Sequence, residues 1–259
     1  MSIAVNVGSP GLANRIKTYA SILTRYKEIR TVKEADTFIF DNIKLAEPGD
    51  TEKYDTFDNW RFRIDDNEYQ YAHGNKYIDL LYHATPPYFR GKYMVTFGKF
   101  KINQDILDYV SDFIEEWDEN TIGLHIRSWY CDRHKYHSNE LFENAIDLYD
   151  KDKKIFLCGD NDEVLKHFED KYGDRIIKHP QKRFNHPHLA ESGHNHETQA
   201  SVDAFIDLLL LSHCDKIVGT YASTFTEVAW WFGDTKPRVT IPEPPNLEES
   251  FKNRIFQKL

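Results

Sequence analysis

Residues 198–233 read TQASVDAFIDLLLLSHCDKIVGTYASTFTEVAWWFG, and this order predicts a helix, a short strand, a turn and a second helix. In the first helix, apolar residues recur every three or four positions, which is typical of a helix that faces a core. Residues 216–218 form the short apolar strand, and small and hydroxyl-bearing residues then lead into the second helix. Thr224 and Glu227 match a T-x-x-E capping box, and Gly233 lies where a glycine commonly ends a helix.

The turn between this strand and the second helix can bind phosphate, because backbone N–H groups and the positive end of the helix dipole face outward there. Ser223 and Thr224 add two hydroxyl groups to the turn. The pattern favours nucleotide chemistry, although such turns also cap helices in proteins that bind no phosphate. Trp230 and Trp231, further along the second helix, are expected to pack in the core rather than to stack on a sugar.

The length of 259 residues allows one large domain or two small ones, and the 40% of hydrophobic residues suffice for a core. The net charge of −9 and the absence of a basic run argue against nucleic acid and anionic membrane surfaces as partners. No apolar run approaches the roughly 20 residues of a membrane span, and the first residues do not fit a signal peptide. The cysteines Cys131, Cys158 and Cys214 are expected to be free thiols in a reducing compartment. These features predict a soluble, cytoplasmic protein.

The first half of the chain begins in the way that Rossmann-like sheets begin. Residues 3–7 predict a strand, which a turn containing Gly and Pro connects to an amphipathic helix. We expect a second strand at residues 37–40 and irregular structure with short strands over residues 45–98. A strand at residues 95–100 is expected to close this region, before a clear amphipathic helix over residues 106–117.

After residues 118–120, strands and helices alternate regularly. The predicted strands of this half are residues 121–126, 154–158, 175–177, 216–218 and 238–241. Strands that alternate with helices form a parallel sheet, which binds ligands at the carboxyl ends of its strands. We therefore predict an α/β protein of two Rossmann-like domains with mostly parallel sheets. The small and irregular N-terminal domain would comprise residues 1–118, and the C-terminal domain residues 119–259.

Three polar groups follow the carboxyl ends of predicted strands, so we expect them to meet at one edge of the sheet. These groups are His125-Ile126-Arg127, Asp160-Asn161-Asp162 and Ala222-Ser223-Thr224. Arg127 offers the planar, bidentate hydrogen bonding that suits a diphosphate. Asp160 could accept hydrogen bonds from a base or a ribose. The alternatives are a surface ion pair for Arg127 and an N-cap role for Asp160.

The segments HIR, FLCGDND and IDLLLLSHCDKIVGTYASTFTEVA, in this order, resemble the three motifs of the fucosyltransferase superfamily. That group includes bacterial nodulation fucosyltransferases, the core α-1,6-fucosyltransferases of N-glycans and protein O-fucosyltransferases. The resemblance covers residues 121–233. It extends to GLANRIKTYAS at residues 11–21, which is similar to the family's N-terminal G-x-G-N-[QR]-[LI] turn, with Ala13 in place of the second glycine.

The resemblance implies a GT-B fold and inverting transfer of fucose from GDP-fucose to a carbohydrate acceptor, with no metal and no other cofactor. By position, Arg127 would hold the donor β-phosphate, His125 would support that strand end, and Asp160 would contact the guanosine. A guanidinium and helix-terminal donors can stabilise departing GDP without a metal. The aromatic, acidic N-terminal half would supply the glycan acceptor surface, because rings stack on sugar faces.

The resemblance also implies roles for residues further along the chain and in the first helix. Ser223 and Thr224 would bind phosphate, and Asp207 on the buried helix would orient the site. Asn14 and Arg15 would approach the donor from the other domain.

Two departures from the family pattern leave the donor sugar and the catalytic base open. Some family members continue H-x-R with R-T-D, where this chain has residues 128–130 as Ser-Trp-Tyr, and Asn161 stands at the second acidic position. GDP-fucose is favoured, and another nucleotide sugar is the alternative. Inverting transfer commonly uses a base near the acceptor hydroxyl, and Asp132, His134 and His137 are candidates by proximity.

Other readings of the sequence involve metal or binding without turnover. Asp160 and Asp162 match the D-x-D of GT-A glycosyltransferases, in which Mn²⁺ or Mg²⁺ bridges the donor diphosphate. The chain could also be a non-catalytic nucleotide-sugar or glycan-binding protein. A histidine-rich segment could ligate zinc, but we expect it to be a polar loop over the nucleotide cleft without a metal. Its histidines are His179, His186, His188, His194 and His196.

Overall fold

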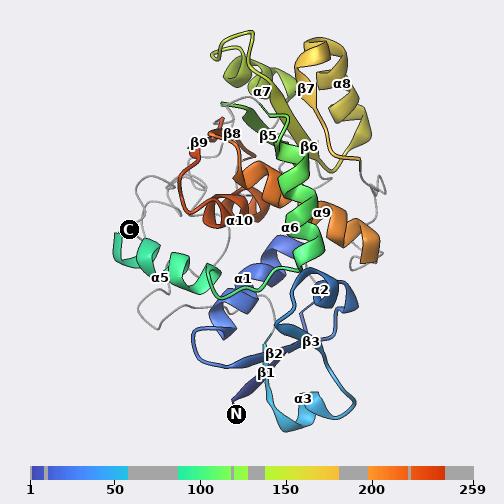
Figure 1. The fold of residues 1–259 in the computed structure, drawn as a ribbon, viewed down its shortest axis with the longest axis vertical. Coiled ribbons are helices and arrows are strands. Elements are labelled where there is room, and N and C mark those ends of the chain that lie inside the picture. Colours follow the sequence, from blue (N-terminus) through green and yellow to red (C-terminus); the bar gives the residue numbers. More distant parts are fainter. Residues whose placement is uncertain are drawn as a thin grey trace.

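The computed structural model describes residues 2–8, 11–57, 87–117, 120–127, 138–180, 198–220 and 223–242. Two sheets lie toward opposite ends of the long axis of the molecule, and a layer of helices lies between them (Figure 1). All strand pairs within both sheets are parallel. The prediction of an α/β protein with parallel sheets is therefore confirmed.

The N-terminal sheet has the strand order β3-β2-β1-β4. Its strands are β1 (Ile3–Asn6), β2 (Glu28–Thr31), β3 (Ile43–Leu45) and β4 (Asp55–Phe57). The described helices of this half are α1 (Leu12–Ile22), α2 (Glu34–Ile39), α3 (Asp50–Lys53), α5 (Pro87–Phe97) and α6 (Gln104–Ile114). α1 forms because its apolar residues recur at helical spacing, and Ile16 and Tyr19 are fully buried.

The C-terminal sheet has the strand order β7-β6-β5-β8-β9. Its strands are β5 (Ile122–Ile126), β6 (Ile155–Gly159), β7 (Ile176–Ile177), β8 (Lys216–Val218) and β9 (Arg238–Thr240). Its helices are α7 (Asn139–Ile146), α8 (Asp162–Tyr172), α9 (Thr198–Ser212) and α10 (Thr224–Phe232). The strands predicted for this half are confirmed within a residue at each end.

The order of the C-terminal strands determines where a ligand can lie. β6 and β7 extend the sheet on one side of β5, whereas β8 and β9 extend it on the other side. This reversal creates a topological switch point between β5 and β8, and sheets of this class bind ligands beyond the carboxyl ends of the strands at such points.

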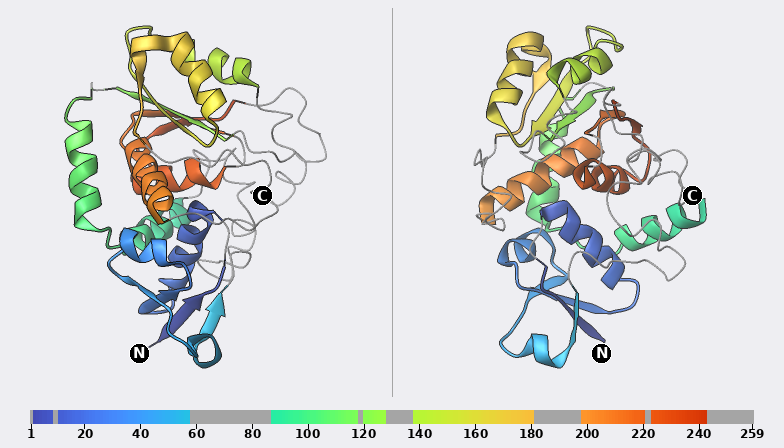
Figure 2. Two further views of the ribbon diagram at one scale, coloured as in Figure 1. Left: turned by 90° about the vertical axis from the view of Figure 1, so that its right-hand side faces the viewer. Right: turned by 180° about the vertical axis from the view of Figure 1, so that it is seen from behind.

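One hydrophobic core connects the two halves through the layer of α1, α9 and α10. The ring of Phe40 packs against Phe205 with centroids 5.1 Å apart, and Tyr93 of α5 stacks on Trp231 of α10 at 4.6 Å. Trp230 and Trp231 are each 1% exposed, which confirms their place in the core. α6 runs lengthwise along the outside of this layer, from the N-terminal half toward the C-terminal sheet (Figure 2).

Three further sequence predictions can be compared with the structure. Within the described ranges, no helix is long and apolar enough to cross a membrane. Cys158 and Cys214 are buried free thiols, as predicted, whereas Cys131 lies outside the described residues. The predicted domain boundary at residues 118 and 119 also lies outside them.

Two predicted strands were wrong. Residues 37–40 largely belong to α2, and the strand expected at residues 95–100 overlaps the end of α5. In such short apolar runs, the spacing of hydrophobic residues does not distinguish a strand from one or two turns of a buried helix. The region expected to be irregular, residues 45–98, contains β4 and α5, although residues 58–86 lie outside the described residues.

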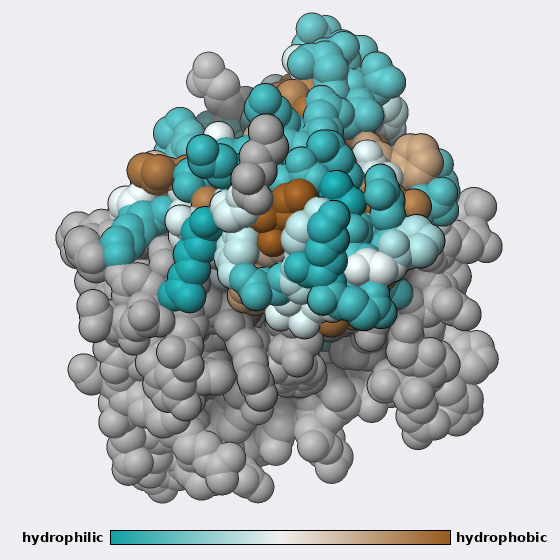
Figure 3. Space-filling view, turned by 90° about the horizontal axis from the view of Figure 1, so that it is seen from below, coloured by the Kyte–Doolittle hydropathy of each residue, from teal (hydrophilic) through white to brown (hydrophobic). Residues whose placement is uncertain are grey.

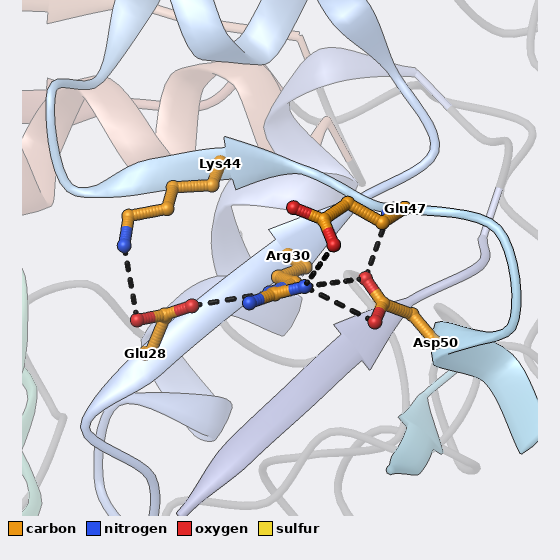
Figure 4. Close-up of polar contacts among 5 residues, drawn as sticks. All are labelled: Glu28, Arg30, Lys44, Glu47 and Asp50. Carbon is orange, nitrogen blue, oxygen red and sulfur yellow. Dashed lines mark hydrogen bonds and ion pairs between the residues drawn. The ribbon is translucent and has the colours of Figure 1, made fainter. Parts of the chain in front are cut away.

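A network of charged residues covers part of the N-terminal sheet. The end of the molecule that carries this sheet is largely hydrophilic around a small apolar area (Figure 3). Arg30 of β2 lies between Glu28, at 3.1 Å, and Asp50, at 2.8 Å, and Lys44 of β3 contacts Glu28 at 3.0 Å (Figure 4). Arg30 and the backbone N–H of Glu47 hold the pKa of Asp50 below its usual value.

Candidate functional site

Residues that follow β5, β6 and β8 meet at one edge of the C-terminal sheet. The parallel register places Ile126 beside Gly159, and Leu124 beside Val218. Arg127, Asp160 and Thr220 therefore emerge close together at the switch point.

Hydrogen bonds of Thr220 connect the end of β5 to the segment that follows β8. Its hydroxyl donates to the carbonyl of His125 at 2.9 Å and accepts from the backbone N–H of Arg127 at 2.8 Å. The backbone that carries the Arg127 side chain is thus held on both sides of Ile126. Sequence reasoning assigned no role to Thr220, because 93 positions separate it from Arg127.

His125 is a buried, uncharged support beneath this edge. Its Nδ1 lies 2.8 Å from the Thr226 hydroxyl of α10, and its ring stacks on Phe225 with centroids 4.7 Å apart. Burial, and to a smaller extent the charge of Arg127, lowers the pKa of His125 to about 3. The imidazole is therefore neutral at physiological pH.

Arg127 and Asp160 form an ion pair at this edge of the sheet, with Nη1 and Oδ2 3.1 Å apart. Their side chains are 31% and 25% exposed, so solvent and a ligand can reach both. Asp160 is not the N-cap of α8. That position belongs to Asn161, whose Oδ1 accepts from the backbone N–H groups of Glu163 and Val164.

Two glycines allow the strand ends to approach one another closely. A Cβ at Gly159 would lie 2.6 Å from the carbonyl oxygen of Ile126, and one at Gly219 would lie 2.4 Å from Thr226 Cγ2. Neither distance is tolerable between non-bonded atoms. The sequence carried a signal for this packing, since each glycine stands at or directly after the carboxyl end of a predicted strand.

The N-terminus of α10 faces the same edge. Ser223 is its N-cap residue, and its side chain makes no capping hydrogen bond. Ser223 and Thr224 are nearly buried, with 3% and 6% of their surface exposed. The predicted capping box between Thr224 and Glu227 is wrong, because the Glu227 carboxylate binds Lys17 instead.

Other predicted donor residues lie in the interior. Arg15 is 2% exposed, and two of its guanidinium nitrogens bind the Asp36 carboxylate at 2.7 Å each. Asn14 is half-buried in the first turn of α1, where its backbone carbonyl accepts from the Thr18 hydroxyl. Asp207 of α9 is buried and lies 3.1 Å from Nδ1 of His179.

The segment proposed to carry the base lies outside the described part of the chain. It includes Asp132, His134 and His137. The later histidines of the histidine-rich segment, residues 186–196, lie outside it as well. The described site therefore consists of His125, Arg127 and Asp160 with the first turn of α10.

No known protein family matches the sequence, and no curated protein matches it at a significant level. Solved structures do match. NodZ α-1,6-fucosyltransferase co-crystallised with GDP is 17% identical, with a TM-score of 0.54 over 88% of this chain and 91% of that chain.

Two further solved structures give the same result. Fucosyltransferase NodZ from Bradyrhizobium gives a TM-score of 0.56 at 16% identity over 95% of this chain and 97% of that one. FUT1 of Arabidopsis thaliana in complex with GDP gives 0.53 at 14% identity over 95% of this chain and 71% of that one. Identities this low establish similarity of fold alone, so the chain shares the α/β fold of these three solved structures.

Proposed function

We propose that this protein is an inverting glycosyltransferase that transfers fucose from GDP-fucose to a carbohydrate acceptor. The observation that carries the proposal is the position of Arg127, which lies beside Asp160 at the sheet edge that the N-terminus of α10 faces. Support comes from the fold shared with NodZ, whose solved structures include one with GDP and one soaked with GDP-fucose.

The proposed chemistry centres on the departing GDP. Its β-phosphate gains negative charge as the bond to the sugar breaks. The Arg127 guanidinium and the backbone N–H groups at the start of α10 would stabilise that charge. Arg127 is paired with Asp160. A bound diphosphate would share Arg127, and the Asp160 carboxylate would accept hydrogen bonds from the nucleoside.

A catalytic base would receive the proton of the acceptor hydroxyl. His125 is unsuited to this role, because it is buried, bonded to Thr226 and neutral down to low pH. The candidates Asp132, His134 and His137 follow Arg127 within ten positions in the sequence.

The test is GDP release from GDP-fucose in the presence of a panel of oligosaccharide acceptors. Arg127→Ala is expected to reduce turnover by about a hundredfold or more, because it removes the main charge facing the leaving group. Arg238→Ala is the matched control, since Arg238 is an exposed arginine at the opposite, amino end of a strand in the same sheet. Unchanged turnover in Arg127→Ala would overturn the site assignment.

The alternatives predict different outcomes in the same assay. If Asp160 and Asp162 hold Mn²⁺ or Mg²⁺ against the diphosphate, EDTA abolishes turnover. A non-catalytic nucleotide-sugar or glycan-binding protein binds nucleotide or glycan and releases no GDP with any acceptor. The proposed enzyme keeps its activity in EDTA.

A further inference from the structure

A fully buried ion pair connects the two halves of the protein. Nζ of Lys17, in α1, lies 2.6 Å from the Glu227 carboxylate of α10, and both side chains are 0% exposed. The same carboxylate accepts a hydrogen bond from Nε1 of Trp231 at 3.1 Å. Two charges from helices 210 positions apart in the sequence thus meet where water does not reach.

The position of Glu227 links this pair to the candidate site. Glu227 belongs to the first turn of α10, and its backbone N–H is bonded to the carbonyl of the N-cap residue, Ser223. The neighbouring Thr226 contacts His125 beneath the end of β5. The first turn of α10 is therefore held from two directions, by β5 through Thr226 and by α1 through Glu227.

Stability alone gives little reason for such a pair. Moving two charges out of water costs free energy that their attraction often only offsets, so a well-packed apolar pair of similar volume is commonly as stable. Position and charge give a better reason. An unneutralised carboxylate in the first turn of a helix competes with an anionic ligand for the positive end of the helix dipole. Lys17 removes that competition and fixes the direction of the helix.

We propose that Lys17 and Glu227 are positioning residues, through which the N-terminal half holds the start of α10 in place to receive the donor diphosphate. This inference rests on the proposed function, because it takes GDP as the ligand. The proposed function assigns the phosphates to the first turn of α10 and the guanosine to Asp160, so the pair would act on phosphate binding and not on guanosine binding.

The test compares GDP and guanosine binding in a neutral pair variant, Lys17→Met with Glu227→Gln, which leaves no unpaired buried charge. GDP affinity is expected to fall about tenfold, in line with losing a well-oriented helix terminus. Guanosine affinity, measured by competition, should change by less than about twofold. The control is Arg30→Met with Asp50→Asn, which removes an ion pair on the N-terminal sheet in the network of Figure 4.

Hydrogen exchange gives a second measurement that needs no ligand. Amides in the first turn of α10 should exchange faster in the pair variant than in the wild type or the control. Equal GDP affinity in the pair variant and the wild type would overturn the inference, as would equal losses for GDP and guanosine. If wild-type protein binds no GDP, the proposed function fails, and the exchange rates alone decide whether the pair positions α10.

Discussion

His125 shows how a single buried residue makes stability depend on pH. In the folded protein its pKa is lowered to about 3 from an ordinary value of 6.5, mainly by burial and secondarily by the charge of Arg127. Below pH 6.5 the unfolded chain therefore binds a proton that the folded protein does not bind. The contribution of neutral His125 to stability is complete above that pH and is lost as the pH falls toward 3.

We predict that His125→Asn makes the free energy of unfolding depend less steeply on pH in the acidic range. Between those two pKa values, the wild-type free energy of unfolding should fall with decreasing pH more steeply than that of the variant, by about 1.4 kcal/mol per pH unit. Urea unfolding at a series of pH values measures both profiles. Parallel profiles for the two proteins would show that His125 does not take up a proton on unfolding.

The sequence predicts the place of a site residue only where that residue lies at the end of a recognisable strand. His125 and Arg127 could be placed because they end an apolar run that precedes a helix. Their partners could not, since Thr220 and Thr226 lie 93 or more positions away. Arg15 was assigned to the donor by motif, but its guanidinium binds Asp36 inside the N-terminal half.

At the level of elements, the start of α8 separates a structural residue from a candidate binding residue. Asn161 accepts two backbone N–H groups at the helix N-terminus, while the adjacent Asp160 pairs with Arg127. The two side chains are adjacent in the sequence, but Asn161 caps the helix and Asp160 forms the ion pair. The helix therefore does not depend on the residue that we assign to the nucleoside.

Substitutions at these two positions should affect different properties, stability at Asn161 and nucleotide binding at Asp160. Asn161→Ala is expected to lower the free energy of unfolding by about 1 kcal/mol, because two backbone donors lose their acceptor. Asp160→Ala should change it by no more than about 0.5 kcal/mol, since its ion pair is partly exposed, but should weaken GDP binding. Urea unfolding and nucleotide titration of both variants test this. A larger loss of stability in Asp160→Ala than in Asn161→Ala would contradict it.

The elements that sequence reasoning identified correctly are those with regular alternation over a long span. The strand–helix alternation after residue 120 predicts the five strands of the C-terminal sheet but not their order, and the strands predicted at residues 37–40 and 95–100 are wrong. In those places, packing against other helices decides the structure. Phe40 follows α2 and packs on Phe205 of α9. These two residues are too far apart in the sequence for the local pattern of hydrophobic residues to predict their contact.

In the molecule as a whole, the larger of two hydrophobic clusters among the described residues contains side chains from both sheets, and the smaller one belongs to the C-terminal half. Rings from the N-terminal half pack on α9 and α10, and Lys17 binds Glu227 across the same layer. Figure 2 shows the layer of helices between the sheets from two sides. The sequence predicted two Rossmann-like units, but it could not predict this shared core, because the ring pairs connect residues far apart in the chain.

We predict that the described halves unfold together. A continuous core makes the loss of one half expose apolar surface of the other, so partial unfolding is unfavourable. Far-UV circular dichroism and tryptophan fluorescence, which report on the helices and on the packing of Trp230 and Trp231, should give coincident urea transitions. Two separated transitions would show that each half is stable alone.

We expect Arg127 and the start of α10 to bind the diphosphate of a GDP-sugar without a metal. Calorimetric titration with GDP in the presence of EDTA, on the wild type and on Arg127→Ala, tests this expectation most directly. We predict that the wild type binds GDP in EDTA and that Arg127→Ala binds it at least about tenfold more weakly. Absence of binding to the wild type, or equal binding to both proteins, would contradict this expectation.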